Sequence, residues 1–167
     1  MGYEEHMKQA RANLPCAVLT ISDTRTKDDD GSGEIIINGL EANGHVVIEY
    51  AILPDSMTGI REAVSGLLRR EEVKVIIVNG GTGITRRDVT VEAVEPLLDK
   101  RLDGFGELFR FLSYQEIGPA AIMSRAIGGL AGGSIVLCLP GSTGAVRLAM
   151  ERIILPQIGH MVLEAEK

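Results

Sequence analysis

The segment "VKVIIVNGGTGITRRDVT" (residues 73–90) contains the features that decide the fold. It opens with a short apolar, β-branched run, as expected of a strand buried on both faces of a parallel sheet. A glycine-rich turn follows directly, and a helical pattern resumes near Thr90. A strand, a polar loop and a helix in this order are typical of α/β domains, in which ligands bind beyond the carboxyl ends of the strands.

Three further segments have the composition of buried strands, at residues 16–21, 45–53 and 134–139. Helical patterns separate these segments from one another and from the strand at 73–78. Alternating strands and helices predict right-handed crossovers between parallel strands. We therefore expect an α/β fold: a single doubly wound, mostly parallel sheet with helices on both faces.

The expected helix ends depend on capping residues. Ser32 is the expected N-cap of a helix that ends at Asn43-Gly44. Either Asp55 or Ser56 caps the helix that follows Pro54. A further helix is expected over 104–118 and another over 146–155, bent or ended by Pro156, whereas residues 122–133 show no assignable pattern.

Composition limits both the size and the class of the protein. The 167 residues suffice for one domain with a sizeable core, and a content of 45% hydrophobic and 24% charged residues is that of a soluble globular protein. Residues 1–13 are expected to form a polar arm and residues 14–167 the domain. The net charge of −6 argues against a nucleic-acid surface. A phosphate site would therefore need locally gathered arginines or a metal ion.

Other classes are excluded by what the chain lacks. No apolar run is long enough to cross a membrane, and the start has no apolar secretion signal, so we expect a cytoplasmic protein without a membrane partner. Cys16 and Cys138 lie in apolar strand segments and are predicted to be buried thiols. The three histidines are scattered, which excludes a zinc site.

Four polar loops follow the predicted strands: "SDTR", "LPDS", "GGTG" and "PGST". Because the carboxyl ends of parallel strands meet at one edge of a sheet, all four loops can line a single crevice. Turn geometry and helix capping explain small polar residues in any one of these loops without a ligand. The four together, one of them followed by two arginines and an aspartate, favour a binding site.

The glycine loop matches neither common phosphate-binding motif, since it is not G-x-G-x-x-G and no Gly-Lys-Ser/Thr follows. Its consecutive glycines allow backbone N–H groups to converge on an anion. Two interpretations of Arg87 and Asp88 stay open. In the first, Arg87 is solvated and Asp88 caps a helix. In the second, Arg87 contacts a phosphate, and Asp88 holds Mg²⁺ or orients a nucleophile. Asp55 has the same alternatives of helix cap and metal ligand.

The motifs "GGTGITRRDVT", "LPGSTGA", "FGELFRFLSYQEIG…MSRA" and the "SDT" turn together resemble the MoaB/MogA family of molybdenum cofactor biosynthesis, which is also similar to the G domain of gephyrin. The resemblance extends from Cys16 to about Gln157 and is closer to the MoaB branch. It implies a molybdopterin adenylyltransferase, a nucleotidyltransferase. The terminal phosphate of molybdopterin attacks the α-phosphate of Mg-ATP, and adenylyl-molybdopterin and pyrophosphate result. Catalysis would rest on alignment and charge stabilisation.

The resemblance also assigns roles by position. Asp88 and Asp55 are the expected catalytic carboxylates and Mg²⁺ ligands, with ATP and molybdopterin as the substrates. Contacts to the nucleotide phosphates are expected from Gly80, Gly81, Thr82, Gly83, Arg87, Ser22 and Asp23. Contacts to the pterin or its phosphate are expected from Ser124, Arg125, Glu107, Pro140, Gly141 and Ser142. Glu107 suits a position in a helix or a subunit interface equally well.

Some bacterial members of the MoaB branch lack the Arg-Asp pair and the activity, whereas this chain keeps "RRDVT". An active enzyme is therefore the first hypothesis, and a catalytically silent pterin carrier of the same pathway is the alternative. A generic dinucleotide-binding domain is disfavoured because G-x-G-x-x-G is missing. The resemblance further implies a homo-oligomer, either a trimer or a hexamer, and a downstream metal-insertion enzyme as partner. Molybdenum and tungsten both remain open as the metal.

Overall fold

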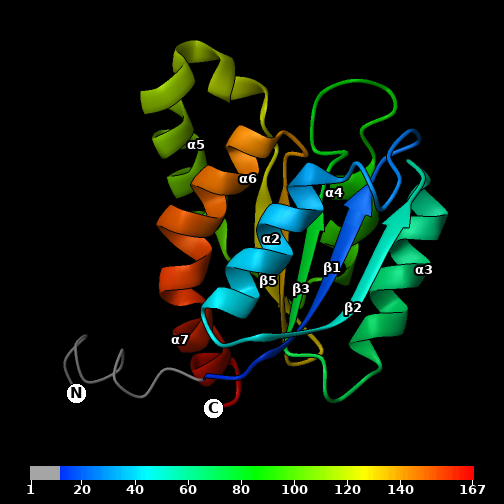
Figure 1. Ribbon diagram of the computed structural model, residues 1–167, viewed down its shortest axis with the longest axis vertical. Coiled ribbons are helices and arrows are strands. Elements are labelled where there is room, and N and C mark those ends of the chain that lie inside the picture. The colour runs from blue at the N-terminus through cyan, green and yellow to red at the C-terminus, as the bar shows by residue number, and fades with distance from the viewer. Residues whose placement is uncertain (1–11) are drawn as a thin grey trace.

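The computed structural model describes residues 12–167, so almost all of the polar arm expected over residues 1–13 lies outside the described residues. Its centre is one six-stranded sheet in the order β2-β1-β3-β6-β5-β4 (Figure 1). Four adjacent strands are parallel, and β5 pairs antiparallel with both β6 and β4. The strands are β1 (Pro15–Ile21), β2 (Val46–Leu53), β3 (Val75–Asn79), β4 (Lys100–Arg101), β5 (Ile127–Ala131) and β6 (Ser134–Leu139).

Helices cover both faces of this sheet, as the alternation of patterns predicts. One face carries α2, α5, α6 and α7, and the other carries α3 and α4 (Figure 1). The helical elements are α2 (Gly31–Ala42), α3 (Met57–Leu68), α4 (Thr90–Val94), the 3-10 turn η1 (Glu95–Leu97), α5 (Asp103–Ile117), the 3-10 helix η2 (Gly118–Met123), α6 (Thr143–Ala149), the π turn η3 (Met150–Ile154) and α7 (Leu155–Ala165).

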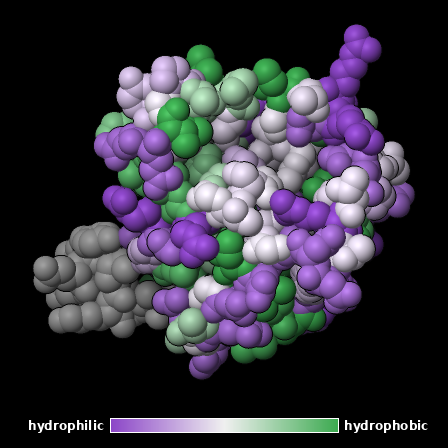
Figure 2. Space-filling view, turned by 45° about the horizontal axis from the view of Figure 1, so that its top comes forward, coloured by the Kyte–Doolittle hydropathy of each residue, from purple (hydrophilic) through white to green (hydrophobic). Residues whose placement is uncertain are grey.

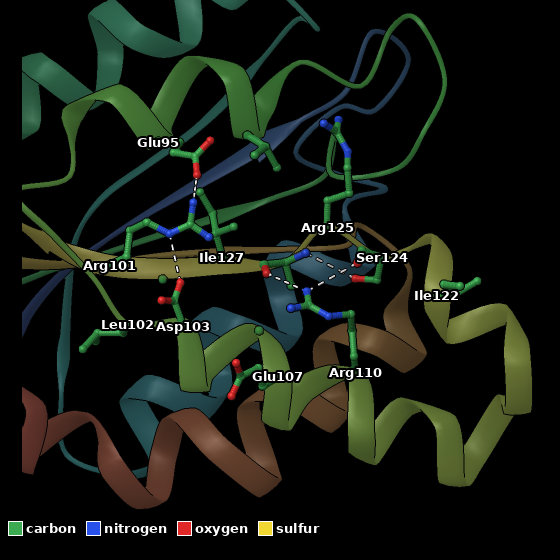
Figure 3. A pocket seen from close by; sticks show the side chains of 14 residues that line it. Glu95, Arg101, Leu102, Asp103, Glu107, Arg110, Ile122, Ser124, Arg125 and Ile127 are labelled. Atoms are coloured by element: carbon green, nitrogen blue, oxygen red, sulfur yellow. Dashed lines mark hydrogen bonds and ion pairs between the residues drawn. The ribbon is translucent and has the colours of Figure 1, made fainter.

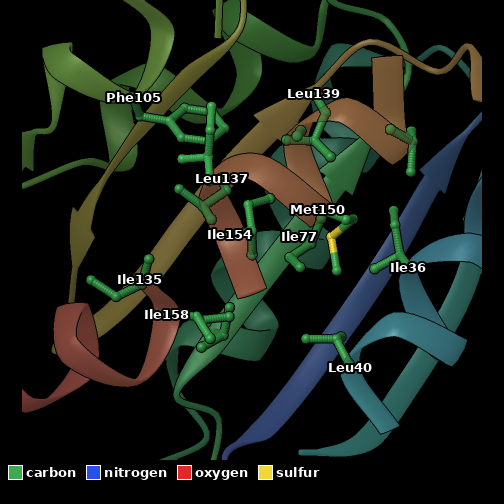
Figure 4. Packing of buried hydrophobic residues seen from close by; sticks show 14 of the residues in the cluster. Ile36, Leu40, Ile77, Phe105, Ile135, Leu137, Leu139, Met150, Ile154 and Ile158 are labelled. Atoms are coloured by element: carbon green, nitrogen blue, oxygen red, sulfur yellow. The ribbon is translucent and has the colours of Figure 1, made fainter. Parts of the chain in front are cut away.

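Successive strand residues pack into different cores. In β1, Cys16 and Val18 join the cluster beneath α2 and α5–α7, whereas Ala17 and Leu19 join the cluster beneath α3. Figure 4 shows the first cluster, with side chains from α2 and η3–α7 meeting those of β3 and β6. Strands with apolar residues on both sides are the signature of a parallel sheet covered on both faces. The predicted fold class is therefore confirmed.

The two cysteines behave as the sequence indicates. Cys16 and Cys138 are free thiols with no exposed surface. Burial raises the pKa of each thiol to about 12, so both stay protonated and unreactive near neutral pH. Within residues 12–167, no helix combines the length and apolar character needed to cross a bilayer.

Capping differs from expectation at one helix and is decided at another. The prediction of Ser32 as the N-cap of α2 is wrong, because the Asp30 carboxylate accepts the hydrogen bond from the Gly33 N–H at 3.0 Å. The Ser32 hydroxyl turns inward instead and is fully buried. At α3, Ser56 accepts from the Gly59 N–H at 3.2 Å, so Asp55 is released from capping.

The chain stays helical beyond Pro156, as far as Ala165, so of the two expectations at this proline, a bend or a helix end, the helix end is wrong. The π turn η3 comes immediately before it, and the proline lies in the first turn of α7, where its missing N–H is tolerated. The unassigned segment 122–133 contains β5. Its glycines allow close packing, since a Cβ on Gly129 would lie 2.5 Å from the Lys100 carbonyl oxygen. Glycines in place of alternating side chains left no strand pattern to read.

Candidate functional site

Four loops meet at the carboxyl ends of β1, β2, β3 and β6 and enclose an open cleft of about 510 Å³. Figure 2 turns this end of the molecule towards the viewer, and near-neutral residues gather in the middle of the face with hydrophilic residues around them. The cleft contains the three aspartates of the expected site, Asp23, Asp55 and Asp88, and two arginines. Its lining includes Ser22, Asp23, Arg25, Asp55, Gly80, Gly81, Arg87, Asp88, Gly141 and Ser142.

The glycine loop needs glycine because the chain turns sharply as it leaves β3. Gly80 and Gly81 have φ angles of 102° and 66°, and a Cβ on Gly80 would lie 2.3 Å from the Ile21 carbonyl oxygen. The buried Thr90 fixes the turn from the far side. Its hydroxyl donates to the Gly80 carbonyl at 2.7 Å, and its N–H donates to the Gly81 carbonyl at 3.0 Å. The loop is therefore rigidly tied to the start of α4.

The loop divides its polar groups between two cavities. The Gly80 N–H is occupied by the Leu139 carbonyl at 2.9 Å, whereas the N–H groups of Gly81 and Thr82 have no acceptor among residues 12–167. Gly81 lines the cleft, but Thr82 and Gly83 line a smaller neighbouring pocket together with Pro140. The Thr82 hydroxyl is buried and lacks a hydrogen-bond partner within the described chain. The residues of the predicted phosphate cradle are thus consecutive in sequence, but they line two different cavities.

Asp88 does not cap α4, which has no side-chain cap. Its carboxylate accepts hydrogen bonds from the N–H and the hydroxyl of Thr85, at 2.8 and 2.6 Å. Burial alone would raise the pKa of Asp88, but these bonds, the Gly83 N–H and the positive charge of Arg125 outweigh it and lower the pKa. Asp88 is therefore an ionised, oriented carboxylate at the cleft.

Asp55 is shifted in the opposite direction. Burial is the largest cause of its raised pKa, and the negative charges of Asp23 and Asp88 add to it, while Arg87 opposes the shift. Asp23 links these groups, since it accepts a hydrogen bond from the Asp55 N–H at 3.0 Å and forms an ion pair of 2.8 Å with Arg87. The cleft therefore holds more negative charge than it balances.

This donor set suits a hard divalent cation in one respect. Carboxylate oxygens are the protein ligands that Mg²⁺ prefers, and Mg²⁺ commonly uses one or two of them together with substrate phosphates. Within residues 12–167, no three His, Cys, Asp or Glu side chains have the spacing of a complete metal site. Asp55 and Asp88 could thus hold Mg²⁺ only jointly with phosphate oxygens and water.

The residues expected to contact the pterin are not gathered in one place. Glu107, Ser124 and Arg125 line a second cavity of about 520 Å³ between α5, β4 and β5 (Figure 3). Gly141 and Ser142 line the cleft instead, and the Ser142 hydroxyl caps α6 by accepting from the Ala145 N–H at 3.4 Å.

Arg125 holds the glycine loop in place. Its Nε donates to the Gly83 carbonyl at 2.7 Å, its Nη2 donates to the Asp88 carbonyl at 2.9 Å, and its Nη1 contacts Glu92. Its backbone N–H also donates to the Thr82 carbonyl at 3.0 Å. The guanidinium group is thus largely occupied by the protein itself.

Sequence reasoning missed two residues of the site. Arg25 lines the cleft and donates from Nη2 to the Gly141 carbonyl at 3.1 Å, and the buried Asp30 carboxylate contacts its Nη1. Asp30 is of a residue type that commonly caps helices and precedes Gly33 by three residues, the spacing of an N-cap hydrogen bond, so a capping signal could have identified it. No local pattern could link Arg25 to Gly141, because the two are distant in sequence and meet only when β1 and β6 flank β3.

The sheet order and the position of the cleft define a doubly wound α/β protein with its site at the carboxyl edge of the parallel strands. Residues 17–160 match the family model described as "Probable molybdopterin binding domain". The chain belongs to this family.

Known relatives span the whole chain. The chain is 50% identical over 168 residues to "Molybdenum cofactor biosynthesis protein B" of Bacillus cereus, covering 100% of this chain and 99% of the relative. A crystal structure of a molybdenum cofactor biosynthesis protein B superposes with a TM-score of 0.91 at 51% identity, over 95% of this chain and 99% of that one. The tungsten cofactor synthesizing protein MoaB from Pyrococcus furiosus gives a TM-score of 0.85 at 38% identity, over 95% and 100% of the two chains.

The glycine requirement of the loop can be tested with Gly80→Ala. The substitution adds a Cβ where φ is 102° and the Ile21 carbonyl oxygen lies 2.3 Å away. We expect the free energy of unfolding to fall by at least about 1–3 kcal/mol, measured by urea denaturation. Gly144→Ala is the matched control, because Gly144 has no atom within 4 Å of an added Cβ. Equal stability of the two variants would contradict the strained geometry of the loop.

The charge excess can be tested by titrating Asp55 with carbon-detected NMR. Asp23→Asn removes one of the negative charges that raise the pKa of Asp55, so this pKa should fall relative to the wild type. Because folding raises the pKa of Asp55, the free energy of unfolding falls as the pH rises from the pKa of Asp55 in the unfolded chain to its pKa in the folded protein. This fall in stability should be smaller in the variant. Asp99→Asn, at the opposite end of the sheet, should leave the titration unchanged. An unaltered Asp55 pKa in Asp23→Asn would refute the coupling.

Proposed function

We propose that the protein catalyses the Mg-ATP-dependent adenylylation of molybdopterin, giving adenylyl-molybdopterin and pyrophosphate, in molybdenum or tungsten cofactor biosynthesis. The family description supports molybdopterin as a ligand, and the names of the relatives support the pathway. One observation of the site carries the reaction type. The ionised Asp88 and an Asp55 whose pKa is raised by burial and by neighbouring carboxylates share a cleft with the Gly81 N–H and two arginines. This arrangement is suited to a metal-bound polyphosphate.

Binding of the nucleotide follows from the charges in the cleft. Its negative groups would repel a triphosphate unless a cation intervened, and Asp55 and Asp88 are the residues that would hold Mg²⁺. When bound, Mg²⁺ would neutralise phosphate charge and increase the electrophilicity of the α-phosphorus. Arg87 pairs with Asp23 but its side chain is 77% exposed, so it can exchange this weak contact for a phosphate at little cost.

The reaction then requires alignment rather than a covalent enzyme intermediate. An oxygen of the terminal molybdopterin phosphate forms a bond to the α-phosphorus of ATP. The bond from that phosphorus to the bridging oxygen breaks, and pyrophosphate leaves. The Gly81 N–H belongs to the loop whose carbonyls are fixed by Thr90, so it can donate to a phosphate oxygen without reorganisation.

The pterin is assigned to the cavity beside Glu107 and Ser124. Its volume of about 520 Å³ is in the range of small-molecule sites, and apolar Leu102 and Ile127 line it together with these polar side chains (Figure 3). Arg125 lines this cavity and also a pocket beside the glycine loop, and Asp88 lines both that pocket and the cleft. A ligand that spans both spaces would bring its phosphate towards Asp88.

A homo-oligomer is part of the proposal. Large apolar side chains are exposed on the outer face of α5 and on η2, among them Phe111 at 59% and Ile122 at 85%. Leu108, Tyr114, Ile117 and Met123 extend this apolar face. Contiguous exposed apolar surface of this kind usually marks a protein interface, and a second copy of the chain is the occupant that the family resemblance implies.

The oligomer can be tested by light scattering after size-exclusion chromatography. Phe111→Ser combined with Ile122→Ser should reduce the mass to that of a monomer, because two large apolar contacts are lost. Met57→Ser is the control, since Met57 is 44% exposed but lies on α3, away from the apolar face. A wild type that already elutes as a monomer would refute this part of the proposal.

The activity can be tested by measuring pyrophosphate release from ATP, Mg²⁺ and molybdopterin. The wild type should release pyrophosphate, and Asp88→Asn should lower the rate roughly 100-fold or more, since it removes a charge but keeps the shape of the site. Asp99→Asn is the matched control, because Asp99 accepts from the Gly132 N–H away from the cleft. Molybdopterin binding without pyrophosphate release by the wild type would favour the alternative, a silent pterin carrier.

A further inference from the structure

A buried carboxylate lies beneath the cleft and has no role in the function proposed above. Asp30 is 3% exposed and accepts hydrogen bonds from the Thr20 hydroxyl at 2.5 Å, the Tyr50 hydroxyl at 2.7 Å and the Gly33 N–H at 3.0 Å. A buried charge with several hydrogen-bond donors is held in a single position. Its Oδ1 also lies 3.3 Å from Nη1 of Arg25.

Arg25 is the group that this carboxylate holds towards the cleft. Nη1 donates to Asp30 and to the Ser32 hydroxyl, and Nη2 donates to the Gly141 carbonyl at 3.1 Å. The Arg25 side chain is 32% exposed and lines the cleft. Its Nε–H and one N–H of Nη2 have no acceptor among residues 12–167. The Nε–H and the remaining N–H of Nη2 are therefore available to donate to phosphate oxygens.

The same network connects the loops on either side of Arg25. Asn79, the last residue of β3, donates to the Thr20 hydroxyl at 2.8 Å and contacts the Ser32 hydroxyl at 2.8 Å. The glycine loop begins with the next residue, Gly80. A Cβ on Gly141 would lie 3.1 Å from the Gly80 Cα, so the loop that Arg25 holds also packs on the glycine loop.

The two arginines of the cleft therefore differ in character. Arg87 is mostly exposed and is neutralised by Asp23. Arg25 is anchored through buried partners, so little side-chain entropy remains to be lost when a ligand binds. An anchored guanidinium group with N–H donors to spare is better suited to bind a phosphate than a solvated one.

We propose that Arg25 binds phosphate oxygens of the polyphosphate in the cleft, and that Asp30 is the positioning residue that orients Arg25 for this contact. The inference rests on the proposed function only in placing a polyphosphate in the cleft. It does not require adenylyl transfer to occur.

The test measures the binding of inorganic tripolyphosphate with Mg²⁺ by isothermal titration calorimetry, using the full chain. Arg25→Gln should raise the Kd roughly 10- to 100-fold, because a charge-assisted contact is lost. The Kd of Arg25→Lys should lie between those of the wild type and Arg25→Gln, since lysine keeps the charge but lacks the planar guanidinium group. Arg70→Gln, at the amino end of the strands, should bind like the wild type. The Kd should also depend less steeply on salt in Arg25→Gln, an effect that a purely structural role would not produce.

A double-substitution cycle tests the positioning role. Asp30→Asn should weaken binding in the wild type but cause little further loss in Arg25→Gln, because it acts through Arg25. Thermal unfolding of each variant shows whether it is folded. Tyr50→Phe, which removes one hydrogen bond to Asp30 and retains its charge, gives a milder variant with the same expected dependence on Arg25.

Three outcomes overturn the inference. They are tripolyphosphate binding that is equal in Arg25→Gln and the wild type, an unchanged salt dependence in Arg25→Gln, and no binding by the wild type. The positioning role alone is overturned if Asp30→Asn or Tyr50→Phe weakens tripolyphosphate binding as much in Arg25→Gln as in the wild type. If binding depends on Arg25 but the wild type releases no pyrophosphate from ATP and molybdopterin, the inference stands and the proposed function fails.

Discussion

The parallel pairing of β2, β1, β3 and β6 is the constraint on which the rest of the structure depends. It brings four carboxyl ends to one edge, so that loops far apart in the chain line the same cleft. Burial of both sheet faces makes this pairing rigid, because each strand contributes side chains to two cores. A one-residue slip of any strand would exchange its two sets of side chains and move its loop. The site is therefore positioned by the core rather than by the loops themselves.

The aspartates of this site differ in how strongly their surroundings stabilise the ionised form. Asp88 and Asp30 are stabilised as carboxylates by hydrogen bonds, whereas Asp55 is destabilised by burial and by its acidic neighbours. Carboxylates whose environments move their pKa values in opposite directions can take different roles. In an acidic chain, a phosphate ligand then depends on a few positioned cations and on exposed N–H groups. The division of Thr82 and Gly81 between two cavities suits a ligand that contacts both sides of the loop.

Much of this architecture was predictable from short-range patterns. The buried strands, the doubly wound sheet and the strand-end loops follow from apolar runs that alternate with helical periodicity, and burial of both thiols follows from their apolar neighbours. The antiparallel β5 was not predictable, because its glycines remove the alternation by which a strand is read. Ser32 was predicted as the cap of α2 in place of Asp30, since serine is a good capping residue, but the Ser32 hydroxyl is taken up by a buried hydrogen-bond network.

The sequence by itself determined the fold class, the four polar loops and the presence of Asp55, Asp88 and the glycines, since these depend on residue type and local spacing. Only the tertiary structure decided what those residues face. Arg25 reaches Gly141 across β3, Arg125 is occupied by the glycine loop, and Glu107 lies in a cavity separate from that of Ser142. Such contacts join residues tens to more than one hundred positions apart. No local pattern encodes them, because they arise from the order in which the strands pair.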